Sequence, residues 1–374
     1  MSGAPLRIAF FGSSLVSAYW NGAATYYRGL LKALAAAGVE VTFFEPDAYD
    51  RQAHRDIADP EWARVRVWAP TAEAARAALR EAEAADLVVK ASGVGVLDEL
   101  LEREVLRLKR GGRLVAFWDV DAPATLHRIL ADRADPFREL VRRYDAVFTY
   151  GGGEAVVSAY RRLGAAACVP VYNALDPETH HVVPRDPAHD CALLFIGNRL
   201  PDREARVEEF FFSVARQRPE RRFLLGGNGW EPGSLPSNVV ALGHVYTTEH
   251  NVLNASALAV LNVHRESMAR FGFSPATRLF EAAGAASCII TDASAGIEAF
   301  LEPEREVLVA STGADVLAHL DALTKVRAAA IGEAARRRVL AEHTYRHRAA
   351  VVLDAWAALR AGQGTHEALA EVAP

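Results

Sequence analysis

The chain has 374 residues, of which 51% are hydrophobic and 24% charged, and its formal net charge is −5. This length suits two domains better than one, and the composition argues against a chain that is disordered throughout. The negative charge argues against a strongly basic face and extended nucleic-acid binding.

Strands and helices are predicted to alternate through the first half of the chain. Leu6–Gly12 is a short apolar run that ends in glycine, which is typical of a buried parallel strand. A helix over 24–38 and a strand over 39–46 complete a βαβ unit, and such units require a parallel sheet. The pattern continues through predicted helices at 71–85, 100–112 and 135–144 and predicted strands at 86–92, 113–121, 145–153 and 164–176. The sequence therefore predicts a doubly wound α/β domain over residues 1–176.

The alternation restarts after residues 176–190, a segment rich in Pro, Asp and His that we interpret as a linker. Strands are predicted at 189–198, 221–230, 238–245 and 257–265, with helices at 203–219 and 247–256. The stretch FGFSPATRLFEAAGAASCIITD (271–292) adds a helix and a buried strand. A second α/β domain is thus predicted over 177–343. Residues 344–374 are predicted to form a last helix, over 345–362, and a tail that frays from Gln363.

Loops at strand ends in the first domain carry candidates for one binding site, because open α/β sheets bind ligands at the carboxyl ends of their strands. The glycines allow close approach of a ligand and expose backbone N–H groups near helix starts, although plain turns explain them equally well. The first loop lacks a GxGxxG fingerprint, and GxxxxGK[ST] occurs nowhere, which argues against NAD and against a P-loop. The candidates on this side are Gly12, Ser13, Asn21, Gly22, Trp118, Gly151 and Gly152.

Asp119, Asp121 and His127 are the candidate catalytic residues. The two carboxylates stand at the end of a predicted strand, where they suit sugar hydroxyls or the role of general base. Two alternatives stay open: Asp121 caps the helix that begins near Pro123 beside a surface histidine, or the three side chains bind a metal. The ligand set for a metal is thin, and we expect none.

The second domain has more polar strand ends. Gly197 and Gly227 each follow a predicted strand, and Arg199 and Arg203 surround the next helix start. A further strand ends in Asn262, His264 and Arg265. All these positions should line one edge of one sheet.

Arg278 and Glu281 stand three residues apart in an apolar helix, behind Ser274 and Thr277 at its start. A helix N-terminus with several arginines forms a diphosphate site that needs no metal, and a glutamate at the same edge suits the two hydroxyls of a ribose. We therefore expect Arg278 to face phosphates and Glu281 to face ribose. The alternative is an ordinary i,i+3 pair on a helix surface.

The motifs YNALD, FIGNRLPDR, ALGHV and TRLFEAAGAASCIITD follow one another along the chain, and AGIEAFLEPEREVLV comes after them. In this order they resemble GT-B glycosyltransferases, and within them the CgeB-like group with the domain called glycosyl transferases group 1. The resemblance covers nearly the whole chain in architecture and is strongest from LLFIGN to EREVLV.

The resemblance implies roles for individual residues. It places Arg203 and Arg199 at a donor diphosphate, His244 and Val245 beside the nucleotide base, and Glu281 at the donor ribose. Many retaining relatives carry two glutamates in an E-x7-E pattern. Phe273 stands where the first would be, so the retaining or inverting outcome stays open.

The resemblance also implies two Rossmann-like domains that face a cleft, with an acceptor site in the first, a nucleotide-sugar site in the second, and the final helix crossing back to the first. The expected reaction is metal-independent transfer of a sugar from a nucleotide-diphosphate sugar to an acceptor hydroxyl. The acceptor itself, whether saccharide, small molecule, lipid or protein, is left open. Alternatives are a nucleotide-sugar 2-epimerase of the same architecture and a non-catalytic nucleotide-sugar-binding protein.

A cytoplasmic location is expected from two features. Cys168, Cys191 and Cys288 lie far apart and form no CxxC pair, as is typical of buried thiols in a reducing compartment. The start MSGAPLRIAFFGSS does not read as a signal peptide, and no run approaches about 18 uninterrupted apolar residues. The oligomeric state is left open.

Overall fold

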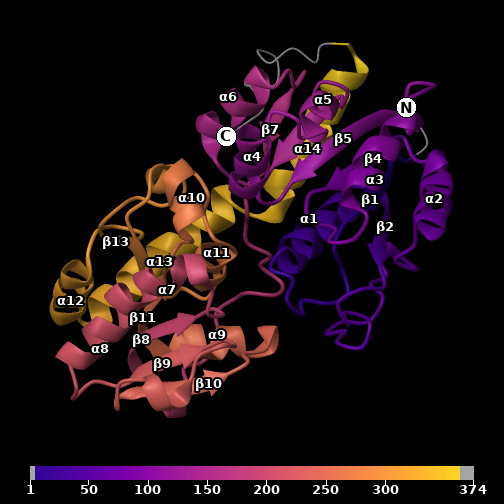
Figure 1. Ribbon diagram of the computed structural model, residues 1–374. Coiled ribbons are helices and arrows are strands. Elements are labelled where there is room, and N and C mark those ends of the chain that lie inside the picture. Colours follow the sequence, from indigo (N-terminus) through magenta and orange to yellow (C-terminus); the bar gives the residue numbers. More distant parts are fainter. Residues whose placement is uncertain (1–4, 363–374) are drawn as a thin grey trace. The chain divides into compact units, whose positions relative to one another are not determined.

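The computed structural model describes residues 5–362 and divides the chain into two units (Figure 1). The first unit holds the chain up to Tyr172 together with the segment from Tyr345 onward, and the second is Asn173–Thr344. These limits lie within a few residues of the domain ends expected at 176 and 343. The tail expected to fray, from Gln363, lies outside the described residues.

The first unit is built on a parallel seven-stranded sheet in the order β3-β2-β1-β4-β5-β6-β7. Its order reverses between β1 and β4, as in a Rossmann-like fold. The strands are β1 (Arg7–Phe11), β2 (Glu40–Pro46), β3 (Arg64–Trp68), β4 (Leu87–Ala91), β5 (Leu114–Asp119), β6 (Ala146–Thr149) and β7 (Cys168–Pro170). The helices are α1 (Ala24–Ala36), α2 (Ala72–Glu81), α3 (Asp98–Glu104), α4 (Ala122–Ala131), α5 (Phe137–Val141), α6 (Gly153–Arg162) and α14 (Tyr345–Arg360).

Helix α14, the last of the chain, belongs to the first unit, where it packs against α1 (Figure 1). Gly29 of α1 permits this contact, because a Cβ atom there would lie 2.1 Å from a ring carbon of Tyr345. The expectation that the final helix returns to the first domain is confirmed.

The second unit is built on a parallel six-stranded sheet in the order β10-β9-β8-β11-β12-β13. The strands are β8 (Cys191–Ile196), β9 (Phe223–Gly226), β10 (Val239–Gly243), β11 (Ala257–Asn262), β12 (Ile289–Asp292) and β13 (Leu308–Ala310). The helices are α7 (Pro201–Val207), the π-helical turn η4 (Glu208–Phe212), α8 (Ser213–Gln217), α9 (Thr247–Ser256), α10 (Glu266–Phe271), α11 (Thr277–Gly284), α12 (Gly313–Ala322) and α13 (Lys325–Glu342). Short 3-10 turns are η1 (Ala82–Ala84), η2 (Val105–Leu108), η3 (Pro187–His189), η5 (Pro232–Ser234) and η6 (Ile297–Ala299).

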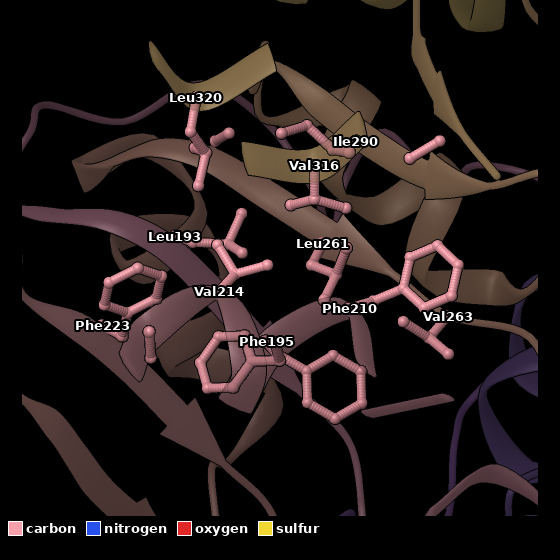
Figure 2. Packing of buried hydrophobic residues seen from close by; sticks show 14 of the residues in the cluster. Leu193, Phe195, Phe210, Val214, Phe223, Leu261, Val263, Ile290, Val316 and Leu320 are labelled. Atoms are coloured by element: carbon pink, nitrogen blue, oxygen red, sulfur yellow. The ribbon is translucent and has the colours of Figure 1, made fainter. Parts of the chain in front are cut away.

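An apolar core lies between this second sheet and the helices on one of its faces (Figure 2). Leu193 and Phe195 alternate along β8, so both side chains point to the same face. They join Leu261 of β11 and the buried phenylalanine Phe210 of η4. Helices also cover the other face, which is why the inner strands read as continuous apolar runs. Both units therefore have the Rossmann-like α/β architecture predicted from the sequence.

Residues 176–190, interpreted as a linker at the start of the predicted second domain, belong to the second unit. Their polar groups bond to α9: Asn251 Nδ2 donates to the carbonyl of Thr179 at 2.9 Å, and Arg185 donates to the carbonyl of Ser256 at 2.6 Å. The composition is that of a linker, but these contacts fix the segment to the domain that follows it.

Candidate functional site

The carboxyl edge of the second sheet is the best-equipped part of the structure for binding a ligand. Strands β8 and β11 pair directly although they are not consecutive, so the strand order reverses between them. Ligands of such sheets bind at this reversal, beyond the carboxyl ends of the strands. The loops that follow β8, β9, β10 and β11 meet there.

Glycines let the loops after β8 and β9 approach each other closely. Gly227 has φ +118, and a Cβ atom on it would lie 2.3 Å from the carbonyl oxygen of Gly197. The indole N–H of Trp230 donates to that same carbonyl at 2.8 Å, and the amide N–H of Asn228 donates to the side chain of Asn198 at 2.9 Å. The need for glycine at 197 and 227 is therefore explained by loop packing at the edge, independently of any ligand.

Three arginines from three elements gather at this edge: Arg203 on α7, Arg265 before α10 and Arg278 on α11. Burial lowers the pKa of Arg203 to about 10, and the positive charges of Arg265 and Arg278 add to that effect. The Nε atoms of Arg203 and Arg278 are buried and have no hydrogen-bond partner among the described residues. Crowded guanidiniums with unused donors favour a bound anion.

Arg203 and Arg265 also have partners within the protein. Arg203 lies with its guanidinium 5.4 Å from the ring centre of Phe195 and donates to the carbonyl of Asn198. Arg265 donates to Asp202 at 2.9 Å. By contrast Arg199 is exposed and pairs with Glu204 at 2.7 Å, so its own position supports a role at the diphosphate less well.

The start of α11 supplies further donors. Its N-cap residue, Ala276, provides no side-chain cap for the first backbone N–H groups of the helix. Ser274 and Thr277, expected to bind the donor, are instead engaged locally: Ser274 Oγ donates to the carbonyl of Gly272 at 2.9 Å, and Thr277 Oγ1 donates to Asn173 Oδ1 at 3.2 Å. Backbone N–H groups, rather than these hydroxyls, are the available donors at this helix end.

Asn262 and His264, also expected at the donor, connect β11 to β12. Asn262 Nδ2 donates to Thr291 Oγ1 at 2.9 Å, and His264 Nδ1 lies 2.5 Å from Asp292. Arg206 also contacts Asp292, at 2.7 Å. Burial alone would raise the pKa of Asp292, but the hydrogen bond from His264 and the nearby charges lower it. These side chains are buried and bond to neighbouring strand ends, and their role at the donor stays a prediction.

His244 and Val245 follow β10. The ring of His244 is exposed, lies 3.4 Å from the amide of Asn228, and meets the ring of Tyr246 edge-on at a centroid distance of 4.5 Å. Val245 packs against Gly226, where an added Cβ would lie 2.6 Å from its side chain. The exposed rings are suited to stacking on a base, and that role stays a prediction.

Glu281 lies at the bottom of this edge and is 5% exposed. Its carboxylate is 3.0 Å from Arg278, 3.6 Å from His250 and 3.8 Å from His180. Burial would raise the pKa of Glu281, but Arg278 and then the two histidines lower it to about 2. The i,i+3 pair considered from the sequence is present, though buried. Its ribose role stays a prediction.

His180 and His250 were not found from the sequence. With Glu281 they offer ligand atoms within 4.8 Å of one another, a group that could hold a metal ion. His180 is about 100 residues from Glu281 along the chain, and no spacing motif links the three.

The catalytic candidates of the first unit lie at the strand end and at the helix that follows it, as the sequence predicted, but two of them are engaged in hydrogen bonds. Asp119 is fully buried and accepts hydrogen bonds from Tyr160 and, at 2.9 Å, from Thr125. Burial raises the pKa of Asp119 and these hydrogen bonds oppose the rise. Asp121 caps α4 by accepting from the amide N–H of Ala124. Asp119 is thus engaged in hydrogen bonds within the unit, and capping, the alternative for Asp121, is observed. The catalytic roles of both stay predictions.

His127 is exposed on α4 and remains a candidate. Trp118 is only 1% exposed and donates to Tyr26 Oη at 3.1 Å, which favours a structural role, and its place on the acceptor side stays a prediction. Ser13 and Asn21 bond to each other at 2.9 Å inside their loop.

Local packing and backbone conformation explain some of the glycines expected on the acceptor side. Gly12 packs under Phe43, and Gly152 starts α6 at φ +94. The carbonyl of Gly151 accepts from Thr149 at 2.9 Å. Gly22 is exposed with open space around it. The acceptor side therefore stays a prediction.

No helix among residues 5–362 has both the length and the apolar character that a membrane span needs.

Comparison with known proteins shows which family model and which solved structures the chain is similar to. Residues 203–354 match the family model described as glycosyl transferase-like. A sucrose-phosphate synthase from Thermosynechococcus elongatus is 16% identical, with a TM-score of 0.71 over 96% of this chain and 100% of that chain. HepE from Anabaena, in complex with UDP and glucose, is 12% identical with a TM-score of 0.67 over 94% and 100%. AviGT4, a glycosyltransferase involved in avilamycin A biosynthesis, is 17% identical with a TM-score of 0.60 over 96% and 99%.

None of the curated protein sequences matches this chain. Residues 203–354 thus match a glycosyl transferase-like family model, and the two units have the GT-B-type fold of these solved structures, as the resemblance implied. Nothing singles out the CgeB-like group.

Proposed function

We propose that the protein transfers a sugar from a nucleotide-diphosphate sugar to an acceptor hydroxyl. The observation that carries the proposal is the arginine group of the second unit, Arg203, Arg265 and Arg278, at the edge where its strand order reverses. The glycosyl transferase-like match covers the same region.

The arginines suit the leaving group of such a reaction. Glycosyl transfer passes through an oxocarbenium-like transition state, while negative charge grows on the departing diphosphate. Fixed guanidiniums and the uncapped N–H groups of α11 stabilise that charge. The unused Nε donors of Arg203 and Arg278 are the groups we expect to turn toward phosphate oxygens.

A uridine nucleotide is the first donor to test. The solved HepE structures are complexes with UDP and with UDP-glucose. By analogy we infer that the exposed ring of His244 lies beside the base in this chain. Glu281 remains our candidate for the ribose hydroxyls.

The diphosphate is proposed to need no Mg²⁺ or Mn²⁺, because the arginines supply the positive charge. Asp119 and Asp121, the closest approach to a DxD pair in the sequence, belong to the first unit and are used in capping and hydrogen bonding there. With Asp119 buried, His127 is the remaining proposed group for the acceptor hydroxyl.

Incubation of the purified protein with UDP-glucose and a panel of other nucleotide sugars tests the proposal. Slow release of free sugar without acceptor, or transfer to an added sugar, is the expected result. An isomerised donor would replace the proposal by the 2-epimerase, and binding without turnover would replace it by a binding protein.

A further inference from the structure

A second group of polar atoms lies under the arginine edge, inside the second unit. His180 comes from the segment before β8, His250 from α9 and Glu281 from α11. Figure 1 shows α9 and α11 in the same region, and the two helices are in contact. His180 is 2% exposed, His250 9% and Glu281 5%, so three polar side chains share one buried space.

The separations within this group are long for hydrogen bonds. His180 Nε2 lies 3.5 Å from His250 Nδ1 and 3.8 Å from Glu281 Oε1, and His250 Nδ1 lies 3.6 Å from Glu281 Oε2. Good hydrogen bonds measure about 2.7–3.2 Å. By contrast, ligand atoms placed about 2.0–2.1 Å from one tetrahedral ion are about 3.3 Å apart. The observed separations are closer to this value than to good hydrogen bonds, and one ligand atom from each of the three residues lies within 4.8 Å of the others.

The Nδ1 atom of His250 is placed to bind a metal. Arg278 Nη1 approaches His250 Nδ1 at 3.4 Å, and a guanidinium can only donate. The lone pair of His250 Nδ1 therefore faces the group.

Arg278 is the competing cation. Its Nη1 contacts Glu281 Oε2 at 3.0 Å as well as His250, and its Nε has no hydrogen-bond partner. The side chain is 16% exposed, which gives it a route outward. A metal ion and this guanidinium would use the same lone pairs, so binding of the ion would release Arg278 toward the edge of the sheet.

We propose that His180, His250 and Glu281 bind one zinc ion in the second unit. Two imidazole nitrogens and a carboxylate oxygen form a ligand set that zinc favours and that Mg²⁺, which prefers oxygen ligands, does not. The ion ties the segment before β8 to α9 and α11. This inference does not rest on the proposed function, because metal binding is measured without donor or acceptor.

Metal content and melting temperature of the purified full chain test the proposal. After treatment with a chelator, the protein is titrated with Zn²⁺, and bound metal is measured by mass spectrometry. We expect one equivalent of zinc and a melting temperature that rises with zinc concentration. Mg²⁺ should give neither effect.

Four variants assign the site: two remove a ligand, one is a control and one removes the competing cation. His180→Ala and His250→Ala should each weaken zinc binding by about 100-fold or more, since even loss of a residue that only orients a ligand costs about 10–100-fold. His181→Ala is the matched control, because its exposed side chain neighbours His180 and should leave zinc binding unchanged. Arg278→Ala should bind zinc more tightly, since the competing cation is gone. Wild-type protein without stoichiometric zinc, or equal loss in His181→Ala, overturns the proposal.

Discussion

Arg203 is the residue whose removal best separates stabilisation of the leaving group from simple binding. Charge on the diphosphate grows as the glycosidic bond breaks, so a fixed guanidinium binds the transition state better than the ground state. We expect Arg203→Ala to lower kcat by about 10²–10³, as for loss of one preorganised oxyanion donor, with less effect on donor KM. Arg203→Lys should recover only part of the loss, because an ammonium cannot make a two-pronged contact.

Steady-state kinetics with UDP-glucose, or the donor found in the panel, measure this effect. Arg216→Ala is a suitable control, since Arg216 is half-exposed on α8 and pairs with Glu208. A wild-type kcat in Arg203→Ala would remove the leaving-group role.

Glu281 should contribute to nucleotide binding, either by accepting hydrogen bonds from the ribose or by orienting Arg278 through their ion pair. We expect Glu281→Ala to weaken binding of a nucleoside diphosphate by about 1.5–3 kcal/mol, the usual contribution of a hydrogen bond to a charged group. Calorimetric titration of the variant, with circular dichroism to verify folding, measures the change. Unchanged affinity in a folded variant would refute the assignment.

Residue positions were predicted better than residue exposure. Asp119 and Trp118 stand at the strand end expected from the sequence. Asp119, however, accepts hydrogen bonds from Tyr160, about 40 residues further along the chain, and from Thr125, 6 residues further along. The spacing of Arg278 and Glu281 showed that they could pair. It could not show that His250 would join them, because that contact depends on how α9 packs on α11.

Among elements, the inner strands were predictable, but two of the edge strands were not. Strand β1 is a run of apolar residues because helices cover both faces of the sheet. The predictions missed β3, whose sequence RVRVW alternates charged and apolar residues at a sheet edge, and β13, which has only three residues. A short or half-exposed strand leaves too weak a pattern to separate from a loop.

Asp292 should stabilise the contact between β11, β12 and α7 in a pH-dependent way. Its folded pKa lies below the ordinary value of 3.8, despite burial, because His264 and Arg206 favour the charged form. The stabilisation is therefore present above about pH 4 and is lost as the pH falls through the lower folded pKa. Asp292→Asn should cost about 3–5 kcal/mol near pH 7, as for breaking a buried pair.

Urea denaturation of wild type and Asp292→Asn across this pH range measures the difference. It should shrink as the pH falls below about 4. A difference that stays constant with pH would show that the charge of Asp292 is not its source.

At the scale of the whole molecule, the two domains were predictable from the repeated alternation of strands and helices. The exact junction was not. The chain leaves the first unit after Tyr172 and re-enters it at Tyr345, and residues 176–190 pack on the second unit. Composition marks a segment without regular structure, but only its contacts show to which domain it belongs.

Divalent ions that bind diphosphate should not be needed for turnover. With Arg203, Arg265 and Arg278 supplying the positive charge, addition of Mg²⁺ or Mn²⁺ should leave the initial rate unchanged. Rates are compared in zinc-loaded protein with and without each ion, so that the proposed zinc site does not affect the outcome. A rate that depends on Mg²⁺ or Mn²⁺ would contradict the arginine-only diphosphate site.

The central claim, that the second unit binds a nucleoside diphosphate through its arginines, is tested most directly by comparing UDP with uridine in a thermal-shift titration. At about 100 times its dissociation constant, a ligand stabilises the folded state by roughly 2.7 kcal/mol, which such a titration resolves. The account predicts that UDP raises the melting temperature, that uridine at the same concentration does so far less, and that the difference is largely lost in Arg203→Ala. Equal effects of UDP and uridine, or no effect of any nucleoside diphosphate, would contradict it.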